Sequence, residues 1–171
     1  MPIYAGGKAR LGKEIATFIS KYEKKMKVSQ KYFEPFCGML GVARHFKNRK
    51  ILCNDINKDL ILMLKAIKDD WRPPISCSKK KYFELKNSTL HSAERGFIGF
   101  ACAYSGIFFA GYRMKHGKRN FFKTFRDNLI DMRDEMKNIT FKSKNYDEFK
   151  PKGMTIYCDP PYKNNNFKSD F

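Results

Sequence analysis

The sequence predicts an α/β fold built around a parallel sheet. Short strand-like segments alternate with amphipathic helical segments along the chain, which is the pattern of parallel strands joined by crossover helices. Loops of unusual composition follow three of these strands, at residues 34–41, 54–57 and 159–162. Because ligands of open parallel sheets bind at the carboxyl ends of the strands, these loops mark the expected functional site. With 171 residues, the chain has room for one domain with a real core.

The first part of the chain supplies two strands and three helices. Apolar residues recur at helical spacing over residues 11–25, which predicts an amphipathic helix. The residues expected on its apolar face are Leu11, Ile15, Phe18, Ile19 and Tyr22. The elements expected after it are a strand over 32–34, a short helix over 42–47, a strand over 50–53 and a helix over 58–70.

The middle of the chain interrupts this alternation. Pro73-Pro74 breaks the pattern, and residues 71–136 form a mainly helical insert. The elements expected from here on are helices over 82–90, 93–105 and 122–136, a Gly-rich basic loop before the last helix, and strands over 139–142 and 154–158. We therefore assign residues 1–70 and 137–171 to the core that carries the sheet.

The chain is strongly basic. Lys and Arg number 35 against 17 Asp and Glu, which gives a formal net charge of +18. Hydrophobic residues make up 42% of the chain, and this excludes an intrinsically disordered protein. Nucleic acid is the first expected partner and an anionic membrane surface the second. No membrane span is expected, because the uncharged stretch 97–112 is shorter than the roughly 20 residues that a span needs.

The cysteines indicate an intracellular protein. There are five of them, an odd number, and none forms a Cys-x-x-Cys pair. Most stand among apolar residues, as reduced core cysteines do. The N-terminus carries a Gly- and Lys-containing segment in place of a secretory signal, and no His/Cys cluster has metal-ligand spacing. We expect neither export nor a bound metal.

The loop Asp159-Pro160-Pro161-Tyr162 carries the most specific signal. Its two prolines delete two backbone donors, so the Asp159 carboxylate and the Pro160 carbonyl present acceptors without competing amides. This arrangement suits a planar amino group that has two N–H bonds to donate. Tyr162 offers a flat face on which a base can stack. The alternative is an ordinary proline turn after an edge strand, which is disfavoured in an α/β chain of charge +18.

The loops after the first two strands are further candidates. The segment Phe33-Glu-Pro-Phe-Cys-Gly38 continues to Gly41, and its glycines allow the backbone to approach a ligand closely. It is neither a dinucleotide Gly-x-Gly-x-x-Gly nor a phosphate-binding P-loop, and a structural turn is the alternative. Asp55 follows the second strand, where nucleotide-binding folds use a carboxylate to hold ribose hydroxyls. Its alternative role is to cap the next helix, which Asn57 can do instead.

Two basic segments complete the candidates. Tyr4-Ala-Gly-Gly-Lys8 has a lysine after two glycines and is a candidate part of the site. The alternative is a flexible N-terminus without a function. Residues 106–126 form a stripe of positive charge interleaved with aromatic residues, as on phosphate-binding surfaces, and a solvated face is the alternative. The candidate DNA-binding residues of this stripe are Arg113, Lys115, Lys118, Arg119, Lys123 and Arg126.

Taken in order, the segments at 4–8, 33–38, 54–57 and 159–162 resemble the DNA adenine-N6 methyltransferases of the Dam-like group. Residues 97–113 look like the corresponding segment of phage and large-virus members. The family implies a Rossmann-like fold and a target-recognition insert, here the DNA-facing part of residues 71–136. It also implies methyl transfer from S-adenosylmethionine to N6 of a flipped adenine in double-stranded DNA. The residues that would hold the adenine are Asp159, Pro160, Pro161 and Tyr162.

The same resemblance implies where the cofactor would bind. Phe36 to Gly38 would line its methionine side, and Asp55 would bind its ribose. The family usually has an acidic residue near the end of the third strand to hold the cofactor's adenine amino group. Asn145 stands there in this chain, and its amide oxygen can accept that bond. The implied cofactor-binding residues are Tyr4, Gly6, Gly7, Lys8, Glu34, Pro35, Phe36, Cys37, Gly38, Asp55, Ile56, Asn145, Tyr146 and Asp159.

Family members continue past the Asp-Pro-Pro-Tyr motif with three more strands, whereas this sequence ends at Phe171. We therefore expect this form to bind cofactor, to methylate poorly, and to shield its free strand edge as a homodimer. Two other functions stay open. One is methylation of RNA adenine, because the motif reads an amino group and not the sugar. The other is a non-catalytic nucleic-acid- or cofactor-binding module. The expected location is intracellular, in the cytoplasm or a viral or host-cell DNA compartment.

Overall fold

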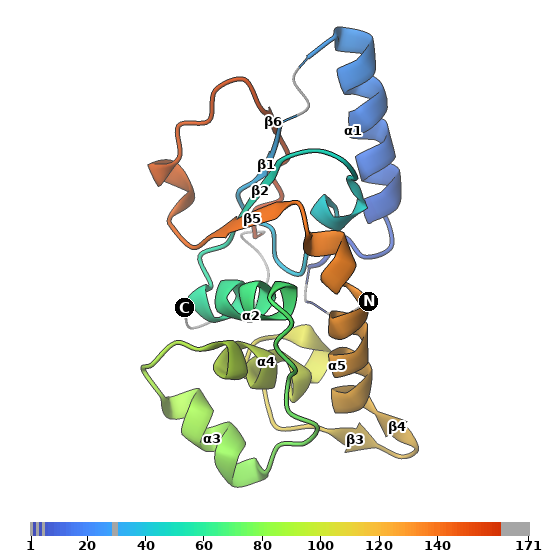
Figure 1. The fold of residues 1–171 in the computed structure, drawn as a ribbon. Coiled ribbons are helices and arrows are strands. Elements are labelled where there is room, and N and C mark those ends of the chain that lie inside the picture. The colour runs from blue at the N-terminus through green and yellow to red at the C-terminus, as the bar shows by residue number, and fades with distance from the viewer. Residues whose placement is uncertain (1, 3, 5, 29–30, 162–171) are drawn as a thin grey trace.

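A four-stranded parallel sheet forms the centre of the computed structural model, which describes residues 2, 4, 6–28 and 31–161 (Figure 1). Its strands are β1 (Tyr32–Glu34), β2 (Ile51–Asn54), β5 (Ile139–Lys142) and β6 (Thr155–Ile156). Their order is β5-β2-β1-β6, and each neighbouring pair is parallel. The chain runs from β1 outward to β2 and β5, then returns to the other side of β1 as β6. This arrangement confirms the predicted α/β fold of the Rossmann-like type.

Five helices accompany the sheet within the described residues. They are α1 (Gly12–Met26), α2 (Lys58–Lys68), α3 (Lys79–Asn87), α4 (Ala93–Ala101) and α5 (Phe121–Asp131). Short 3-10 turns lie at η1 (Ala43–His45), η2 (Tyr104–Gly106), η3 (Arg133–Met136) and η4 (Tyr146–Glu148). An Asn or Ser side chain caps the start of each helix from α2 to α5 by accepting a backbone N–H three residues later. None of the described helices is both long and apolar enough to cross a membrane.

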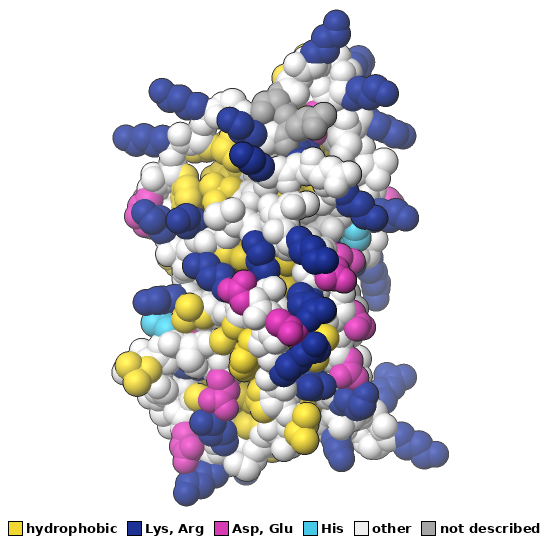
Figure 2. All heavy atoms as spheres, viewed as in Figure 1, with side chains coloured by type: hydrophobic (Ala, Val, Ile, Leu, Met, Phe, Trp, Pro, Cys, Tyr) yellow, Lys and Arg dark blue, Asp and Glu magenta, His cyan; other side chains and the backbone are white. Residues whose placement is uncertain are grey.

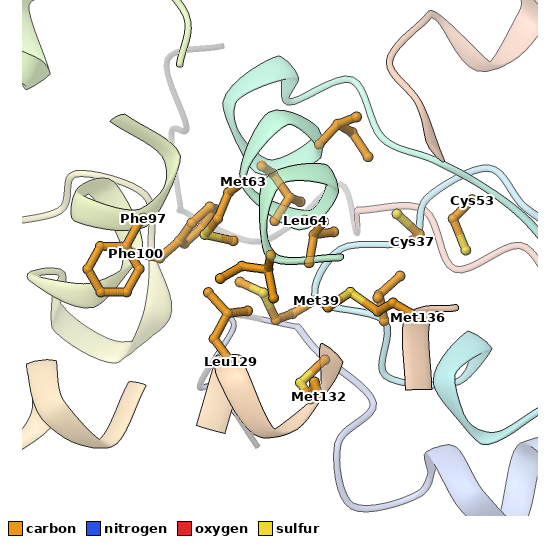
Figure 3. Close-up of a cluster of buried hydrophobic side chains, with 14 of the residues drawn as sticks. Cys37, Met39, Cys53, Met63, Leu64, Phe97, Phe100, Leu129, Met132 and Met136 are labelled. Carbon is orange, nitrogen blue, oxygen red and sulfur yellow. The ribbon is translucent and has the colours of Figure 1, made fainter. Parts of the chain in front are cut away.

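One hydrophobic core joins the sheet to the helices that follow it. Figure 3 follows this core from Phe97 on α4 through Met63 on α2 to Cys53 on β2 and Cys37 in the loop after β1. Helix α4 lies so close to α2 that a Cβ on Gly96 would come within 2.2 Å of a backbone oxygen. The inserted helices are therefore fixed against the core and do not form a loosely attached module.

Helix α1 differs from the sequence prediction. Of its predicted apolar face, Leu11, Phe18 and Tyr22 are more than half exposed, and Phe18 reaches 71%. The predicted Ile15 and Ile19 do pack against the core, next to the buried Ala16. The helix also docks through Gly12, whose missing side chain lets it touch Gly41, a contact that sequence periodicity does not report.

A buried ion pair holds the far end of α1. Glu23 accepts two hydrogen bonds from the Arg49 guanidinium, at 2.7 and 2.8 Å, and both side chains are almost fully buried. The guanidinium lies 5.3 Å from the centre of the Tyr32 ring and 4.7 Å from that of Phe46. Glu23 lies outside the predicted apolar face of the helix and is nevertheless buried. The Arg49 guanidinium, which lies against two aromatic rings, neutralises its charge and accounts for this burial.

Several element boundaries also differ from prediction. The expected basic loop contains a hairpin of β3 (Lys115–His116) and β4 (Arg119–Asn120), too short to give an alternating pattern. The predicted helix over 122–136 is divided into α5 and η3, and the helix over 93–105 ends at Ala101. The last strand is restricted to Thr155–Ile156, because its partner β1 is itself only three residues long before Pro35.

Candidate active site

A cavity of about 470 Å³ opens at the carboxyl ends of β1 and β6. This is where the strand order reverses, the place at which open α/β sheets bind their ligands. Its size is that of a small-molecule or cofactor site. The predicted site residues that line it are Tyr4, Gly6, Gly7, Lys8, Glu34, Pro35, Phe36, Cys37, Gly38, Asp55, Ile56, Asn145, Tyr146, Asp159, Pro160 and Pro161. Tyr162 lies outside the described residues.

The N-terminal segment lies across the loop that follows β1. Gly38 has a φ of +46°, and a Cβ on it would come within 2.7 Å of the Tyr4 ring. Tyr4 in turn packs on Phe100, with 5.5 Å between ring centres. Burial raises the pKa of Tyr4 further above its ordinary value of 10.0, which disfavours a phenolate at this position. The glycine is needed both for the turn and for the contact with the tyrosine.

This contact predicts the effect of Gly38→Ala. The new methyl would meet the Tyr4 ring and the backbone would be held in a left-handed conformation, so we expect a loss of about 3 kcal/mol in unfolding free energy. Gly153→Ala is the matched control, since Gly153 has a φ of +62° and a Cβ added there would meet nothing within 4 Å. It should cost about 1 kcal/mol. Urea unfolding measures both, and equal losses would contradict the contact with Tyr4.

Asp55 ties the first two loops together from the end of β2. Its carboxylate accepts the Gly38 N–H at 2.9 Å and the Asn57 N–H at 3.0 Å. Burial raises the pKa of Asp55, against the lowering effect of these two hydrogen bonds. Asn57, and not Asp55, caps α2 by accepting the Leu60 N–H at 3.0 Å. The capping alternative for Asp55 is therefore excluded, and the residue borders the cavity.

Glu34 is a buried carboxyl group at the end of β1. Burial raises its pKa to about 8, although the Tyr32 hydroxyl donates a hydrogen bond to it at 3.3 Å. Asp55 and Asp159, which follow the neighbouring strands, raise the pKa further by repulsion. Glu34 is therefore mainly protonated at neutral pH and adds little negative charge to the cavity.

Asp159 forms an ion pair with Lys8, and both residues line the cavity. The Lys8 ammonium lies 2.6 Å from the Asp159 carboxylate, and both side chains are largely but not fully buried. Lys8 also donates to the Gly6 carbonyl at 3.2 Å. The pair joins the first segment of the chain to the loop after the last described strand and fixes the direction of the carboxylate.

Two features of this site were missed by sequence reasoning. Asn54 connects three loops, because its amide donates to the Pro35 and Lys144 carbonyls and accepts the Lys144 N–H. The insert supplies an aromatic wall that includes Phe100 and Phe108. The glycines within residues 97–113 could have indicated this wall, because they leave room for aromatic rings. A Cβ on Gly99 would lie 2.2 Å from the Phe108 ring.

A second aromatic pair also lines the cavity. The rings of Phe36 and Tyr146 lie 5.2 Å apart, centre to centre, and both residues line the cavity. Asn145 lines it as well, next to Tyr146. Its backbone N–H donates to the Glu148 carboxylate at 2.9 Å, and its side chain accepts the Glu148 backbone N–H, which forms a capping box at the start of η4. A planar ring that enters here would meet aromatic surface and an amide whose oxygen already accepts one hydrogen bond and has a second lone pair.

Five of the six predicted DNA-binding residues fall into two groups, while Arg113 belongs to neither and lies against the Tyr104 and Phe121 rings. Lys115, Lys118 and Arg119 stand exposed on the β3–β4 hairpin, which projects from the lower right of the molecule where Figure 2 shows Lys and Arg side chains. Lys123 and Arg126 on α5 have partners within the chain. Lys123 pairs with Asp127 at 2.5 Å, and Arg126 donates to the Pro73 carbonyl at 3.0 Å. The hairpin thus carries the more available positive charge.

Fold and site together define a methyltransferase of the Rossmann-like class, with an Asp-Pro-Pro loop at the cavity where the strand order reverses. The chain belongs to the family of D12 class N6 adenine-specific DNA methyltransferases, whose sequence profile matches residues 4–100 and 97–171. It is also similar to the type II methyltransferase M.MjaIII of Methanocaldococcus jannaschii, with 25% identity over 205 residues that cover 98% of this chain and 70% of the relative. Of the functions that the sequence leaves open, adenine-N6 methylation of DNA is the one supported.

Proposed function

We propose that the 470 Å³ cavity binds S-adenosylmethionine and the adenine that is methylated. The observation that carries this proposal is the convergence of five separate chain segments, each predicted from sequence, on one cavity at the reversal of strand order. The cofactor supplies an electrophilic methyl group on a sulfonium. The residues present fit such a group: glycine backbone at Gly7 and Gly38, a carboxylate at Asp55, and the Phe36–Tyr146 ring pair.

In this proposal, Asp159 and the Pro160 carbonyl accept the two N–H bonds of the adenine N6 amino group. The nitrogen lone pair is delocalised into the ring and is a poor nucleophile. Hydrogen bonds from both N–H groups would favour a tetrahedral nitrogen and localise its lone pair toward the methyl group. As the N–C bond forms, the C–S bond would break to leave a neutral thioether, and the nitrogen would lose one of its two protons to the Asp159 carboxylate or to solvent. Catalysis of this kind depends on positioning and electrostatics and needs no strong general base. Tyr162 is proposed to stack on the adenine ring.

We infer that the substrate is double-stranded DNA from which the adenine is flipped out. The amino group is base-paired within a duplex, so it reaches the cavity only after the base leaves the stack. Lys115, Lys118 and Arg119 on the hairpin are proposed to contact phosphates, because they are exposed and no acidic residue stands within the hairpin. The expected intracellular location follows from this substrate.

We also propose that the protein associates as a homodimer. Among the described strands, β6 pairs with β1 alone, and Ile156 on this edge is 45% exposed. The apolar side chains Phe18 and Tyr22 of α1 are exposed as well. An open strand edge and an apolar helix face both favour association.

The cofactor assignment is tested by replacing Asp55. Loss of a hydrogen bond to a charged group is expected to weaken S-adenosylmethionine binding by about tenfold or more, as measured by calorimetry. Asp55→Asn keeps an acceptor oxygen for only one of the Gly38 and Asn57 N–H groups, so urea unfolding of the variant is measured beside its cofactor affinity. Asp147→Ala is the control, because Asp147 is exposed and does not line the cavity. Equal affinities of all three proteins for the cofactor would remove Asp55 from the site.

A further inference from the structure

The side-chain amide of Asn54 is buried at the end of β2, where it lines the cavity. Its nitrogen donates to the Pro35 carbonyl at 3.1 Å and to the Lys144 carbonyl at 3.0 Å. Its oxygen accepts the Lys144 N–H at 3.0 Å. Both N–H bonds of the amide are therefore used within the chain, and none is left to donate to a ligand. Asn54 can still affect a ligand through the two chain segments that it holds.

The first of these segments follows β1 and is tied to Asn54 on both sides of Phe36. The side chain of Asn54 binds the Pro35 carbonyl, and the main-chain carbonyl of Asn54 accepts the Cys37 N–H at 2.8 Å. The peptide units before and after Phe36 thus have fixed partners. Because these bonds restrict the backbone of Phe36, they also restrict the direction in which its ring enters the cavity.

The second segment follows β5 and is held through Lys144. Both backbone groups of Lys144 pair with the Asn54 amide, which takes the place of a peptide group in a strand ladder. The turn η4 begins two residues later, at Tyr146. The rings of Tyr146 and Phe36 lie 5.2 Å apart, centre to centre, and their planes meet at 47°. One buried amide therefore connects the backbone segments that carry both rings.

We propose that Asn54 is a positioning residue that sets the Phe36–Tyr146 ring pair, and that it controls through this pair the binding of the adenine ring of S-adenosylmethionine. The inference rests on the proposed function, which places the cofactor in this cavity. A planar ring gains most affinity from an aromatic surface that is held in shape before the ring binds. Asparagine suits this role because it combines two donors and an acceptor on a short side chain, whereas Asp has no donor when ionised and Gln is longer.

The test is a double-mutant cycle on the affinity for S-adenosylmethionine, measured by calorimetry. Asn54→Ser shortens the side chain and leaves a single donor. Tyr146→Leu removes one ring at a position that is 58% exposed. Each single variant is expected to bind the cofactor about tenfold more weakly, and the double variant should be within about twofold of the weaker single variant. Losses that multiply to about a hundredfold in the double variant would overturn the proposal, because Asn54 would then act independently of the ring pair.

Asn54→Asp is a second variant, chosen to keep the shape of the side chain. It retains an acceptor for the Lys144 N–H but loses both donors, so it should weaken cofactor binding at least as much as Asn54→Ser does. Its loss should also disappear in the Tyr146→Leu background. Wild-type affinity in both Asn54 variants would overturn the proposal.

Asn120→Ala is the matched control for a loss of stability alone. Asn120 caps α5 by accepting the Lys123 N–H at 2.9 Å, and it is not among the described residues that line the cavity. Its replacement should lower the urea midpoint, as Asn54→Ser also does, but leave the cofactor affinity within about twofold of wild type. Equal losses of affinity in the two variants would assign the effect of Asn54 to stability and overturn the positioning role.

Two fragments of the cofactor locate the effect along the ligand. 5′-Methylthioadenosine carries the adenine ring, whereas methionine does not. In competition with S-adenosylmethionine, Asn54→Ser should weaken binding of 5′-methylthioadenosine about tenfold and leave that of methionine within about twofold. A loss that is equal for both fragments, or confined to methionine, would place the effect outside the ring pair and overturn the proposal.

These outcomes can be told apart from a failure of the proposed function. Wild type that does not bind S-adenosylmethionine would overturn both the proposed function and the role of Asn54. Wild type that binds the cofactor and depends on Asp55, but shows additive losses for Asn54 and Tyr146, would overturn the positioning role alone.

Discussion

Replacing Asp159 with alanine is expected to lower methyl transfer to DNA by roughly 10²–10³-fold while leaving the affinity for S-adenosylmethionine within about threefold of wild type. The carboxylate sits at the carboxyl end of β6, and Lys8 holds its direction at 2.6 Å. Its proposed hydrogen bond to adenine N6 strengthens as the nitrogen becomes tetrahedral, so its removal affects the transition state more than the ground state. Single-turnover transfer of tritium from labelled cofactor to DNA measures the rate, and calorimetry measures the affinity.

Two further variants separate the carboxylate from its ion pair. Asp159→Asn keeps the shape and one acceptor oxygen but loses the charge, and it should fall between wild type and Asp159→Ala. Lys8→Met removes the ammonium and leaves the carboxylate, so it should reduce the rate less than Asp159→Ala does. Retention of wild-type rate by Asp159→Ala would rule out the proposed role. A loss of cofactor affinity as large as the loss of rate would make Asp159 a binding residue.

The sheet and the buried helices could be predicted because their signals are local. β1 and β5 have the predicted bounds, and α2 has its predicted start at Lys58 after the capping Asn57. Helix α1 shows the limit of such signals. Its apolar periodicity correctly predicts a helix, but which face is buried depends on Gly41 and Arg49, which lie on other elements. Periodicity within one segment cannot report contacts of this kind.

The candidate site could also be predicted from the sequence only in part. The loops that follow the strands could be predicted to converge, because parallel strands bring their carboxyl ends to one edge of the sheet. The aromatic wall at Phe100 and Phe108 could not, since it depends on the end of α4 and the segment after it lying beside the loops of the sheet. The stacking of Arg113 between Tyr104 and Phe121 is also non-local. In the sequence, Arg113 is one of several cations in a basic stripe, and only its surroundings distinguish it from the exposed Lys115 and Lys118.

Glu34 predicts a dependence of stability on pH. Its pKa is about 8 in the folded protein because of burial, against an ordinary value of 4.5. Between these values the folded state holds a proton that the unfolded chain has released, so a rise in pH favours unfolding. The contribution of Glu34 to stability is therefore complete below about pH 4.5 and is lost as the pH rises through about 8.

Glu34→Gln tests this dependence, because the amide is neutral at every pH. Relative to the variant, wild type is expected to lose on the order of 4 kcal/mol of unfolding free energy between pH 5 and pH 9, as measured by urea unfolding at each pH. Glu14→Gln is the matched control on the exposed surface of α1, and it should follow the wild-type profile. If Glu34→Gln lost stability with pH as steeply as wild type, the buried carboxyl would not be the group that releases the proton. The test compares the pH profiles of wild type and Glu34→Gln. Other groups that titrate in this range are common to both proteins, so the difference between the two profiles isolates the effect of Glu34.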